Sequence, residues 1–268
     1  MGFNTVNSRM ICKCGGVMNL IEAETLTYQC PVCGKCDMDI PILSKKENTQ
    51  EPELLNRMEK LEEGELEWRR ALIVVDMQND FINGKLMVQS PKGMDVVRNV
   101  CDIIYKVGIS YDTVIATVDC HRPQDFRDGE TLECCALPEH CLEYSNGMAI
   151  HKDVYDALQE LIGADKFVRF LKKSTFTTTE LAGTKMAGFH NRENTAIDIV
   201  GLCTDVCVIS TALMLRSEFP KAKIRVIEDA CAGTSDKAHE CALEVMDSCL
   251  IGKMTTEQLI QEAKEYAK

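Results

Sequence analysis

The stretch TAIDIVGLCTDVCVISTALMLRSEF, residues 195–219, decides the fold. Residues 195–202 form a nearly continuous apolar run rich in β-branched side chains, which predicts a strand buried on both faces. Residues 207–219 follow at once and have the composition of a helix. A buried strand that leads directly into a helix is the repeating unit of a parallel α/β sheet.

The same alternation extends through the rest of the chain from residue 71. Apolar runs that predict four further strands are ALIVVD (71–76), TVIATVD (113–119), KFVRFL (166–171) and KIRVIED (223–229). Segments with helical patterning separate them: MDVVRNVCDIIYKVG (94–108), VYDALQELIG (154–163) and KAHECALEVMDSCL (237–250). Right-handed crossovers then predict a three-layer α/β domain over residues 70–268, with a mostly parallel sheet covered by helices on both faces.

Composition and charge exclude several classes of protein. The formal charge of −12 disfavours nucleic acid as a partner, because phosphate binding needs clustered Lys and Arg. No apolar run approaches the roughly 18 residues that span a bilayer, so no membrane partner is expected. The first residues, MGFNTVNSRMICKCGG, lack the apolar stretch of a signal peptide, so we expect a cytoplasmic location.

The fifteen cysteines do not indicate a disulfide scaffold. Their number is odd, and a chain of 268 residues can bury a core without covalent cross-links. Free cysteine is commonly a small buried hydrophobic residue. We assign that role to the cysteines that lie in apolar or helical surroundings: Cys101, Cys231, Cys241 and Cys249.

The N-terminal region has a different character. Residues 9–41 contain five cysteines, and CKCGG (12–16) and CPVCG (30–34) resemble the two knuckles of a zinc ribbon. Four thiolates complete a tetrahedral zinc site, so one structural zinc is expected on four of them, with Cys36 as a replacement ligand or idle. The alternative is a tail of unrelated free thiols. Residues 42–69 are highly charged and predict a linker or a solvated helix. The four expected zinc ligands are Cys12, Cys14, Cys30 and Cys33.

Chemically capable side chains follow the predicted strands. Active sites of parallel sheets form at the carboxyl ends of the strands. Asp76 ends the first strand, and Cys207 lies where the helix after residue 202 begins. A helix N-terminus favours a thiolate and can stabilise an oxyanion. Asp76 and either Lys172 or Lys173 are candidates to handle protons, although a cysteine in an apolar run is more often a packing residue.

Three motifs strengthen that interpretation. VVDMQNDF (74–81), VGLCTDVCVISTA (200–212) and EDACAGTSDKAHECAL (228–243) resemble the isochorismatase-like cysteine hydrolases, in the right order and over roughly residues 71–260. The resemblance implies that Asp76 is the proton acceptor, a lysine near position 173 assists, and Cys207 is the nucleophile. It also implies a cis peptide before Cys203, and an oxyanion hole made by the backbone N–H groups of Cys203 and Cys207. Lys173 fits the family pattern best, and Lys172 stays open.

A second pair of motifs indicates a metal site. DCH (119–121) and LPEHC (137–141) resemble the metal-binding segments of the nicotinamidases within this family. The resemblance implies that Asp119, His121 and His140 bind a divalent ion, with Glu133 or Glu130 as a further ligand. A mixed carboxylate and imidazole set suits Zn, Fe or Mn. The alternative for each histidine is a packed or surface residue.

The resemblance implies an amide hydrolase that acts through a cysteine thioester and converts nicotinamide to nicotinate and ammonia. Alternatives are another cysteine amidohydrolase with a ureido, carbamoyl or other small amide substrate, and a non-catalytic protein that binds partners through its zinc ribbon. Isochorismatases proper have Asp in place of Cys207, which disfavours ether hydrolysis. The acidic charge disfavours a nucleic-acid-binding zinc ribbon. Members of the family are usually oligomers, so we expect at least a homodimer.

Overall fold

The computed structural model divides the chain into two units, Met1–Trp68 and Arg69–Lys268. It describes residues 68–88, 92–186, 189 and 194–266, together with the backbone of three short N-terminal strands. These strands form an antiparallel sheet in the order β1-β2-β3. The four expected zinc ligands (Cys12, Cys14, Cys30 and Cys33) lie outside the described residues. The three N-terminal strands are β1 (Asn19–Glu22), β2 (Thr27–Gln29) and β3 (Cys36–Asp39).

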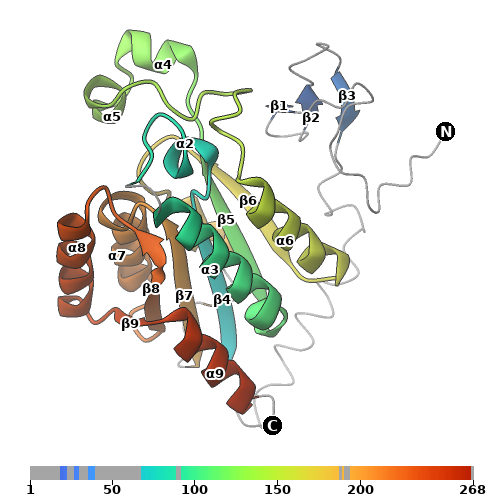
Figure 1. Cartoon of the computed structure of the whole chain (residues 1–268), viewed down its shortest axis with the longest axis vertical. Coiled ribbons are helices and arrows are strands. Elements are labelled where there is room, and N and C mark those ends of the chain that lie inside the picture. Colours follow the sequence, from blue (N-terminus) through green and yellow to red (C-terminus); the bar gives the residue numbers. More distant parts are fainter. Residues whose placement is uncertain are drawn as a thin grey trace. The chain divides into compact units, whose positions relative to one another are not determined.

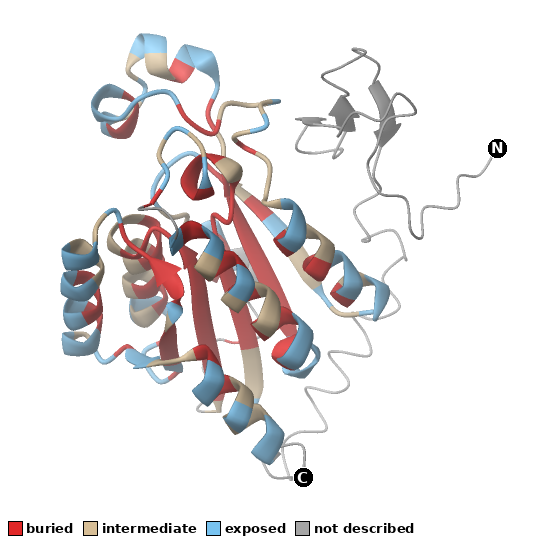
Figure 2. Cartoon of the chain, viewed as in Figure 1, coloured by how far each residue is buried: buried red, intermediate tan, exposed pale blue. Residues whose placement is uncertain are grey.

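The larger unit is built on a six-stranded parallel sheet with the strand order β6-β5-β4-β7-β8-β9. The predicted α/β fold is therefore confirmed. Four of the five predicted strands lie close to their expected positions, and the central strands are buried along most of their length (Figure 2). The strands are β4 (Arg69–Val75), β5 (Thr113–Asp119), β6 (Val168–Lys173), β7 (Thr195–Leu202), β8 (Lys223–Ala232) and β9 (Gly252–Met254).

Helices cover both faces of this sheet (Figure 1). One hydrophobic cluster joins α3 (Lys92–Val107), α6 (Lys152–Gly163) and α9 (Thr256–Tyr266) to one face. A second cluster joins α7 (Ile209–Glu218) and α8 (Asp236–Ser248) to the other face. Alternate residues of β4 separate between the clusters, since Leu72 and Val74 face the first whereas Ile73 and Val75 face the second. Both faces of the strands are thus apolar, as the continuous runs predicted.

Two details of the sheet differ from the sequence prediction. The apolar run predicts a strand over 166–171, but β6 runs from Val168 to Lys173 and includes both candidate lysines. Lysines at the end of an apolar run look like the start of a loop, yet Lys173 pairs with Asp119 of β5 in the parallel ladder. The sixth strand, β9, was not predicted because GKM (252–254) has no apolar pattern.

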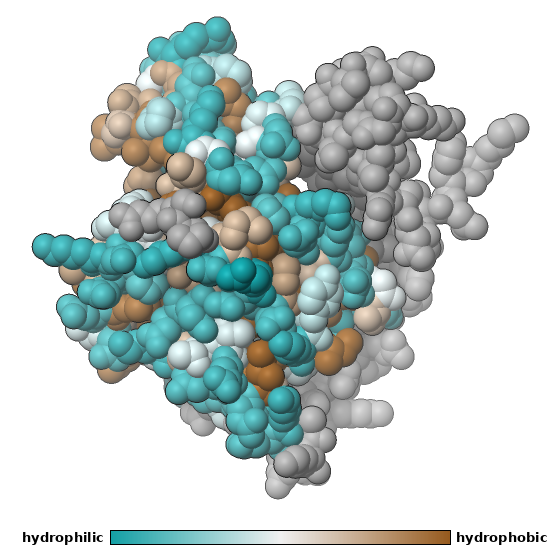
Figure 3. All heavy atoms as spheres, viewed as in Figure 1, coloured by the Kyte–Doolittle hydropathy of each residue, from teal (hydrophilic) through white to brown (hydrophobic). Residues whose placement is uncertain are grey.

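Short helices at the carboxyl edge of the sheet were also not predicted. These are α2 (Asn79–Ile82), α4 (Pro123–Asp128) and α5 (Leu132–Ala136). The segment 123–136 extends beyond the strands (Figure 1), and hydrophobic residues gather over α5, whereas α4 is mostly hydrophilic (Figure 3). Leu132 is 87% exposed there, whereas its neighbour Glu133 is buried. In the part of the chain that the structure describes, no helix has the length and apolar character needed to cross a membrane.

Candidate active site and metal centre

Four strands deliver polar side chains to one edge of the sheet. Asp76 directly follows β4, Asp119 is the last residue of β5, Lys173 is the last residue of β6, and Cys207 lies just after β7. The carboxyl ends of parallel strands lie at the same edge, so residues from four distant parts of the sequence meet. All four side chains are buried, with exposures of 5% or less.

Lys173 lies at the centre of this group. Its Nζ is 2.8 Å from Asp76 Oδ2, 3.2 Å from Asp119 Oδ1 and 3.6 Å from Cys207 Sγ. Lys172 points elsewhere, because consecutive residues of a strand face opposite sides. Its side chain is partly exposed, and its Nζ lies 3.9 Å from Glu143. The structure therefore brings Lys173, and not Lys172, to Asp76 and Cys207.

Burial and charge set the protonation of these groups. Burial raises the pKa of the Cys207 thiol well above its ordinary value; Lys173 opposes this shift, whereas Asp76 adds to it. Burial also raises the pKa of Asp76 despite the nearby Lys173. Burial alone would lower the pKa of Lys173, but the carboxylates and the Cys207 sulfur outweigh it and raise that pKa. Desolvation of the Cys207 thiol thus opposes the effect expected from the helix N-terminus.

The loop that carries Cys207 has an unusual backbone. The Leu202–Cys203 peptide bond is cis, as the resemblance implied. Residues 204–208 form a turn of π geometry, so Cys207 lies in the helical turn that precedes α7. The Asp205 carboxylate accepts hydrogen bonds from the backbone N–H of Thr234, at 2.8 Å, and from its hydroxyl. The loop that carries Cys207 is thus held against the segment that follows β8.

Close approach of two strands explains a glycine just before this loop. Gly201 has a φ of +118°, a conformation that other residues rarely adopt. A Cβ at this position would lie 2.0 Å from the carbonyl oxygen of Val75. The absence of a side chain therefore lets β7 approach the end of β4, where Asp76 begins.

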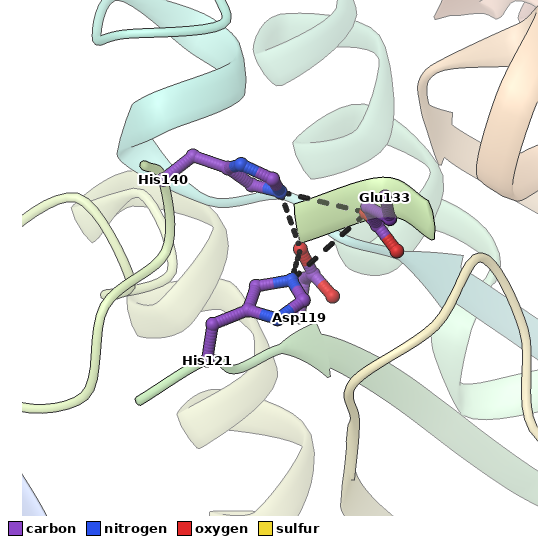
Figure 4. A group of neighbouring side chains, drawn as sticks. All are labelled: Asp119, His121, Glu133 and His140. Carbon is purple, nitrogen blue, oxygen red and sulfur yellow. Dashed lines mark hydrogen bonds and ion pairs between the residues drawn. The ribbon is translucent and has the colours of Figure 1, made fainter. Parts of the chain in front are cut away.

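A group of possible metal ligands shares Asp119 with the cluster around Lys173, and Figure 4 shows its four members. Ligand atoms of the four residues all lie within 4.8 Å of one another, and all four side chains are buried. Asp119 Oδ2 is 3.1 Å from His121 Nε2 and 3.2 Å from His140 Nε2. Glu133 Oε1 is 3.5 Å from His140 Nε2. Glu133 reaches this group from α5, whereas Glu130 is exposed. The four members are Asp119, His121, Glu133 and His140.

The donor atoms fit a divalent ion. His140 Nδ1 donates to the carbonyl oxygen of Pro138 at 2.8 Å, which leaves a lone pair on Nε2. That Nε2 is buried without a hydrogen-bond partner. Burial would lower the pKa of His140, but the adjacent carboxylates of Asp119 and Glu133 raise it to about 10. Two carboxylates therefore attract a positive charge at this point, and a metal ion bound by these four residues would supply it.

Asp119 belongs to both groups. Its Oδ1 faces Lys173, and its Oδ2 faces the two histidines. Burial would raise the pKa of Asp119, but Lys173 and the adjacent imidazoles of His121 and His140 lower it far below its ordinary range. One ionised carboxylate thus connects the metal ligands to the lysine beside Cys207.

Sequence reasoning missed two residues that position these groups. The Gln78 side chain donates to the carbonyl oxygen of Asp119 at 2.8 Å and accepts from its N–H at 2.7 Å. Asp80 Oδ2 accepts from the N–H of Cys141, next to His140, at 2.7 Å. Both residues are buried and polar. The available signal was their place in MQNDF (77–81), directly after an apolar strand.

Comparisons with known proteins identify relatives of residues 70–258. The Isochorismatase domain matches residues 70–258. The chain is 31% identical to a nicotinamidase/pyrazinamidase of Mycobacterium tuberculosis over 180 residues, which cover 66% of this chain and 94% of that protein.

Solved structures show the same fold. A nicotinamidase/pyrazinamidase from Bacillus subtilis superposes with a TM-score of 0.59 at 24% identity, covering 69% of this chain and 98% of that one. A pyrazinamidase of Pyrococcus horikoshii in complex with zinc gives a TM-score of 0.53 at 25% identity, covering 70% and 99%. With the domain match spanning more than half of its length, the chain belongs to the isochorismatase family.

Proposed function

We propose that the protein is a metal-dependent cysteine amidohydrolase that converts nicotinamide to nicotinate and ammonia. The observation that carries this proposal is the contact of Lys173 with Asp76, Asp119 and Cys207 at the sheet edge. Relatives named nicotinamidase, from Mycobacterium tuberculosis and other organisms, support the substrate. The same contacts disfavour a purely non-catalytic binding protein, because a buried acid–lysine–thiol group is costly without a role.

In the proposed reaction, Cys207 starts as a thiol. Asp76 accepts the Cys207 proton while the sulfur attacks the carboxamide carbon, and Lys173 stabilises the charge that develops between them. The backbone N–H groups of Cys203 and Cys207 would stabilise the oxyanion. The carbon–nitrogen bond then breaks, and ammonia leaves with the proton returned by Asp76. Water attacks the thioester, releases nicotinate and restores the thiol.

The possible metal ligands would hold an ion that contacts the substrate and not the Cys207 sulfur. Asp119, His121, Glu133 and His140 would hold a Zn, Fe or Mn ion, for which the donor set is suited. When bound, the ion would supply a Lewis-acid site for the ring nitrogen of a pyridine carboxamide. Phe126 borders this position, with its ring centre 5.3 Å from that of His121 and 5.5 Å from that of His140.

Replacement of the nucleophile tests the proposal. Cys207→Ala should abolish ammonia release from nicotinamide, because no other thiol of the described residues contacts Lys173. Cys231→Ala is the matched control: this thiol is also buried, on β8, but it lies outside the catalytic group. The control should retain turnover. Turnover of nicotinamide by a folded Cys207→Ala variant would rule out the thioester mechanism.

A substrate screen separates the alternatives. Ammonia release is measured with nicotinamide, pyrazinamide, aliphatic amides and ureido compounds, with and without a chelator. We expect nicotinamide and pyrazinamide to be preferred, the chelator to abolish their turnover, and added metal to restore it. A preference for ureido or aliphatic substrates that survives chelation would instead identify another cysteine amidohydrolase of this family.

A further inference from the structure

The catalytic carboxylate lies where two neighbouring strands separate. The ladder between β4 and β5 pairs Ala71 with Thr113 and continues to Val74 with Ala116. Asp76 then adopts a φ of +46°, in the left-handed region that disfavours residues other than glycine. The chain turns away from β5 at this residue, so the regular ladder does not hold Asp76 in place.

Beyond the end of the ladder, the hydroxyl of Thr117 on β5 holds Asp76. Thr117 Oγ1 accepts a hydrogen bond from the backbone N–H of Asp76 at 3.2 Å. The same hydroxyl donates to Asp76 Oδ1 at 2.7 Å. Both side chains are buried, with exposures of 2% for Thr117 and 0% for Asp76. One residue therefore fixes both the strained backbone and the carboxylate of Asp76.

The two carboxylate oxygens of Asp76 therefore have different partners. Oδ1 is occupied by the Thr117 hydroxyl. Oδ2 faces Lys173 Nζ at 2.8 Å as an ion pair and has no well-directed hydrogen bond. The terminal torsion of an aspartate is broad, so an untethered carboxylate would rotate. The Thr117 hydroxyl keeps Oδ2 on the side of Lys173 and the Cys207 thiol.

We propose that Thr117 is a positioning residue for amide hydrolysis, which orients the Asp76 carboxylate toward the proton of Cys207. The inference rests on the proposed function, because it assigns the proton of Cys207 to Asp76. Thr117 does not touch the substrate or the sulfur in this role. It acts through Asp76 alone, and the metal ligand two residues later, Asp119, keeps its own contacts with Lys173 and Gln78.

The chain offers a matched control on the same strand. Thr113 lies four residues before Thr117 on β5, so both side chains point to the same face of the sheet. Thr113 is also buried, at 4% exposure, but its hydroxyl has no hydrogen-bond partner. Replacement of either threonine by valine preserves its shape and removes only the hydroxyl.

The test compares Thr117→Val, Thr117→Ser and Thr113→Val with the wild type in the metal-loaded full chain. We expect Thr117→Val to lower kcat for nicotinamide by about 10- to 100-fold, the range for losing a hydrogen bond to a charged group, with little change in KM. Thr117→Ser retains the hydroxyl and should recover most of kcat. Thr113→Val should leave kcat unchanged, and all variants should bind zinc as the wild type does.

Every other outcome would contradict either the role of Thr117 or the proposed function. A wild-type kcat in Thr117→Val would overturn the inference and leave the proposed function intact. Equal losses in Thr117→Val and Thr117→Ser would assign Thr117 a packing role only, as would a loss confined to KM or to zinc affinity. A wild-type protein that hydrolyses neither nicotinamide nor any other amide would remove the proposed function itself, and the positioning role with it.

Discussion

Two groups of charged side chains are buried in the sheet, one in its amino-terminal half and one at its carboxyl edge. In the first, Asp198 of β7 accepts hydrogen bonds from Arg225 Nε at 2.7 Å, from Arg225 Nη2 at 3.0 Å and from the Tyr111 hydroxyl at 2.8 Å. In the second, Asp76 Oδ2 and His140 Nε2 are buried without a hydrogen-bond partner. Both groups contain a buried carboxylate beside a cation, but both oxygens of Asp198 accept hydrogen bonds, whereas Asp76 Oδ2 has no hydrogen-bond partner.

The difference separates a structural role from a chemical one. Arg225 also donates through Nη1 to both carboxylate oxygens of Glu262, at 2.7 Å each, and so joins the sheet to α9. Asp198, Arg225 and Glu262 satisfy one another, although Arg70 Nη2, 3.7 Å from Asp198, is buried without a hydrogen-bond partner. The incompletely paired atoms at the carboxyl edge are where we place a proton in transfer and a metal ion. Incomplete pairing of buried groups is costly, and it is expected mainly where a ligand or a reaction uses it.

Loss of the central lysine should have the largest effect. Lys173→Met removes the cation beside Asp76 and Cys207, and we expect kcat for nicotinamide to fall by at least about 10⁴-fold, or about 5.5 kcal/mol. Lys172→Met is the control, because Lys172 lies on the other face of β6 beside Glu143 and should retain most of the activity. Steady-state kinetics of both variants, with folding checked by circular dichroism, makes the comparison. Similar losses in the two variants would contradict the assignment of Lys173.

Breaking the other group should cost stability and not catalysis. Arg225→Met leaves the buried Asp198 carboxylate with the Tyr111 hydroxyl and with Arg70, whose Nη2 is 3.7 Å away. We expect the free energy of unfolding to fall by about 3 kcal/mol, because removal of one partner exposes the other to an unfavourable apolar environment. Urea denaturation measures this loss, and kcat of the folded protein should remain that of the wild type.

The exposed Lys223 provides the control for that variant. Its Nζ lies 3.7 Å from Glu262, and nearly half of its side chain is exposed. Lys223→Met should therefore change the free energy of unfolding by less than about 1 kcal/mol, as is usual for surface ion pairs. If Arg225→Met were as stable as Lys223→Met, or lost kcat, the division into a structural and a chemical group would fail.

The sequence predicted most of the fold because the signal was strong. A buried parallel strand must be apolar on both faces, and the runs at 71–76, 113–119, 195–202 and 223–229 have no other simple interpretation. Strand β9 carried no such signal, since its three residues pair at the edge of the sheet. The short helices α4 and α5 depend on capping and on contacts with the histidines, which no local periodicity encodes.

The site was only partly predictable, because the side chains that reach it depend on where each strand ends and on the face to which each residue points. Motifs placed Asp76, Cys207 and the histidines, but the choice between Lys172 and Lys173 needed the end of β6. Leu171 offered a usable signal: it is buried, and residue 173 shares its face of the strand. Glu133 lies in the first turn of α5, which brings its side chain to the histidines, whereas Glu130 precedes the helix and is exposed. The role of Thr117 could not be predicted for another reason: a threonine within TVIATVD has the pattern of any β-branched strand residue.

A smaller effect than that of Arg225→Met is expected at Glu262, and it depends on pH. Burial would raise the pKa of Glu262, but its hydrogen bonds with Arg225 lower it below the ordinary value of 4.5. A carboxylate with a depressed pKa contributes stability above its unfolded pKa and loses it as the pH falls through its folded pKa. Glu262→Gln should therefore cost about 1 kcal/mol at pH 7, and the difference from the wild type should shrink as the pH falls below 4.5. Urea denaturation of both proteins between pH 3 and pH 7 tests this, with Glu265→Gln, one helical turn away at the exposed end of α9, as the control. A difference that stays constant with pH would mean that α9 is held by packing, and that the amino-terminal group ends at Asp198 and Arg225.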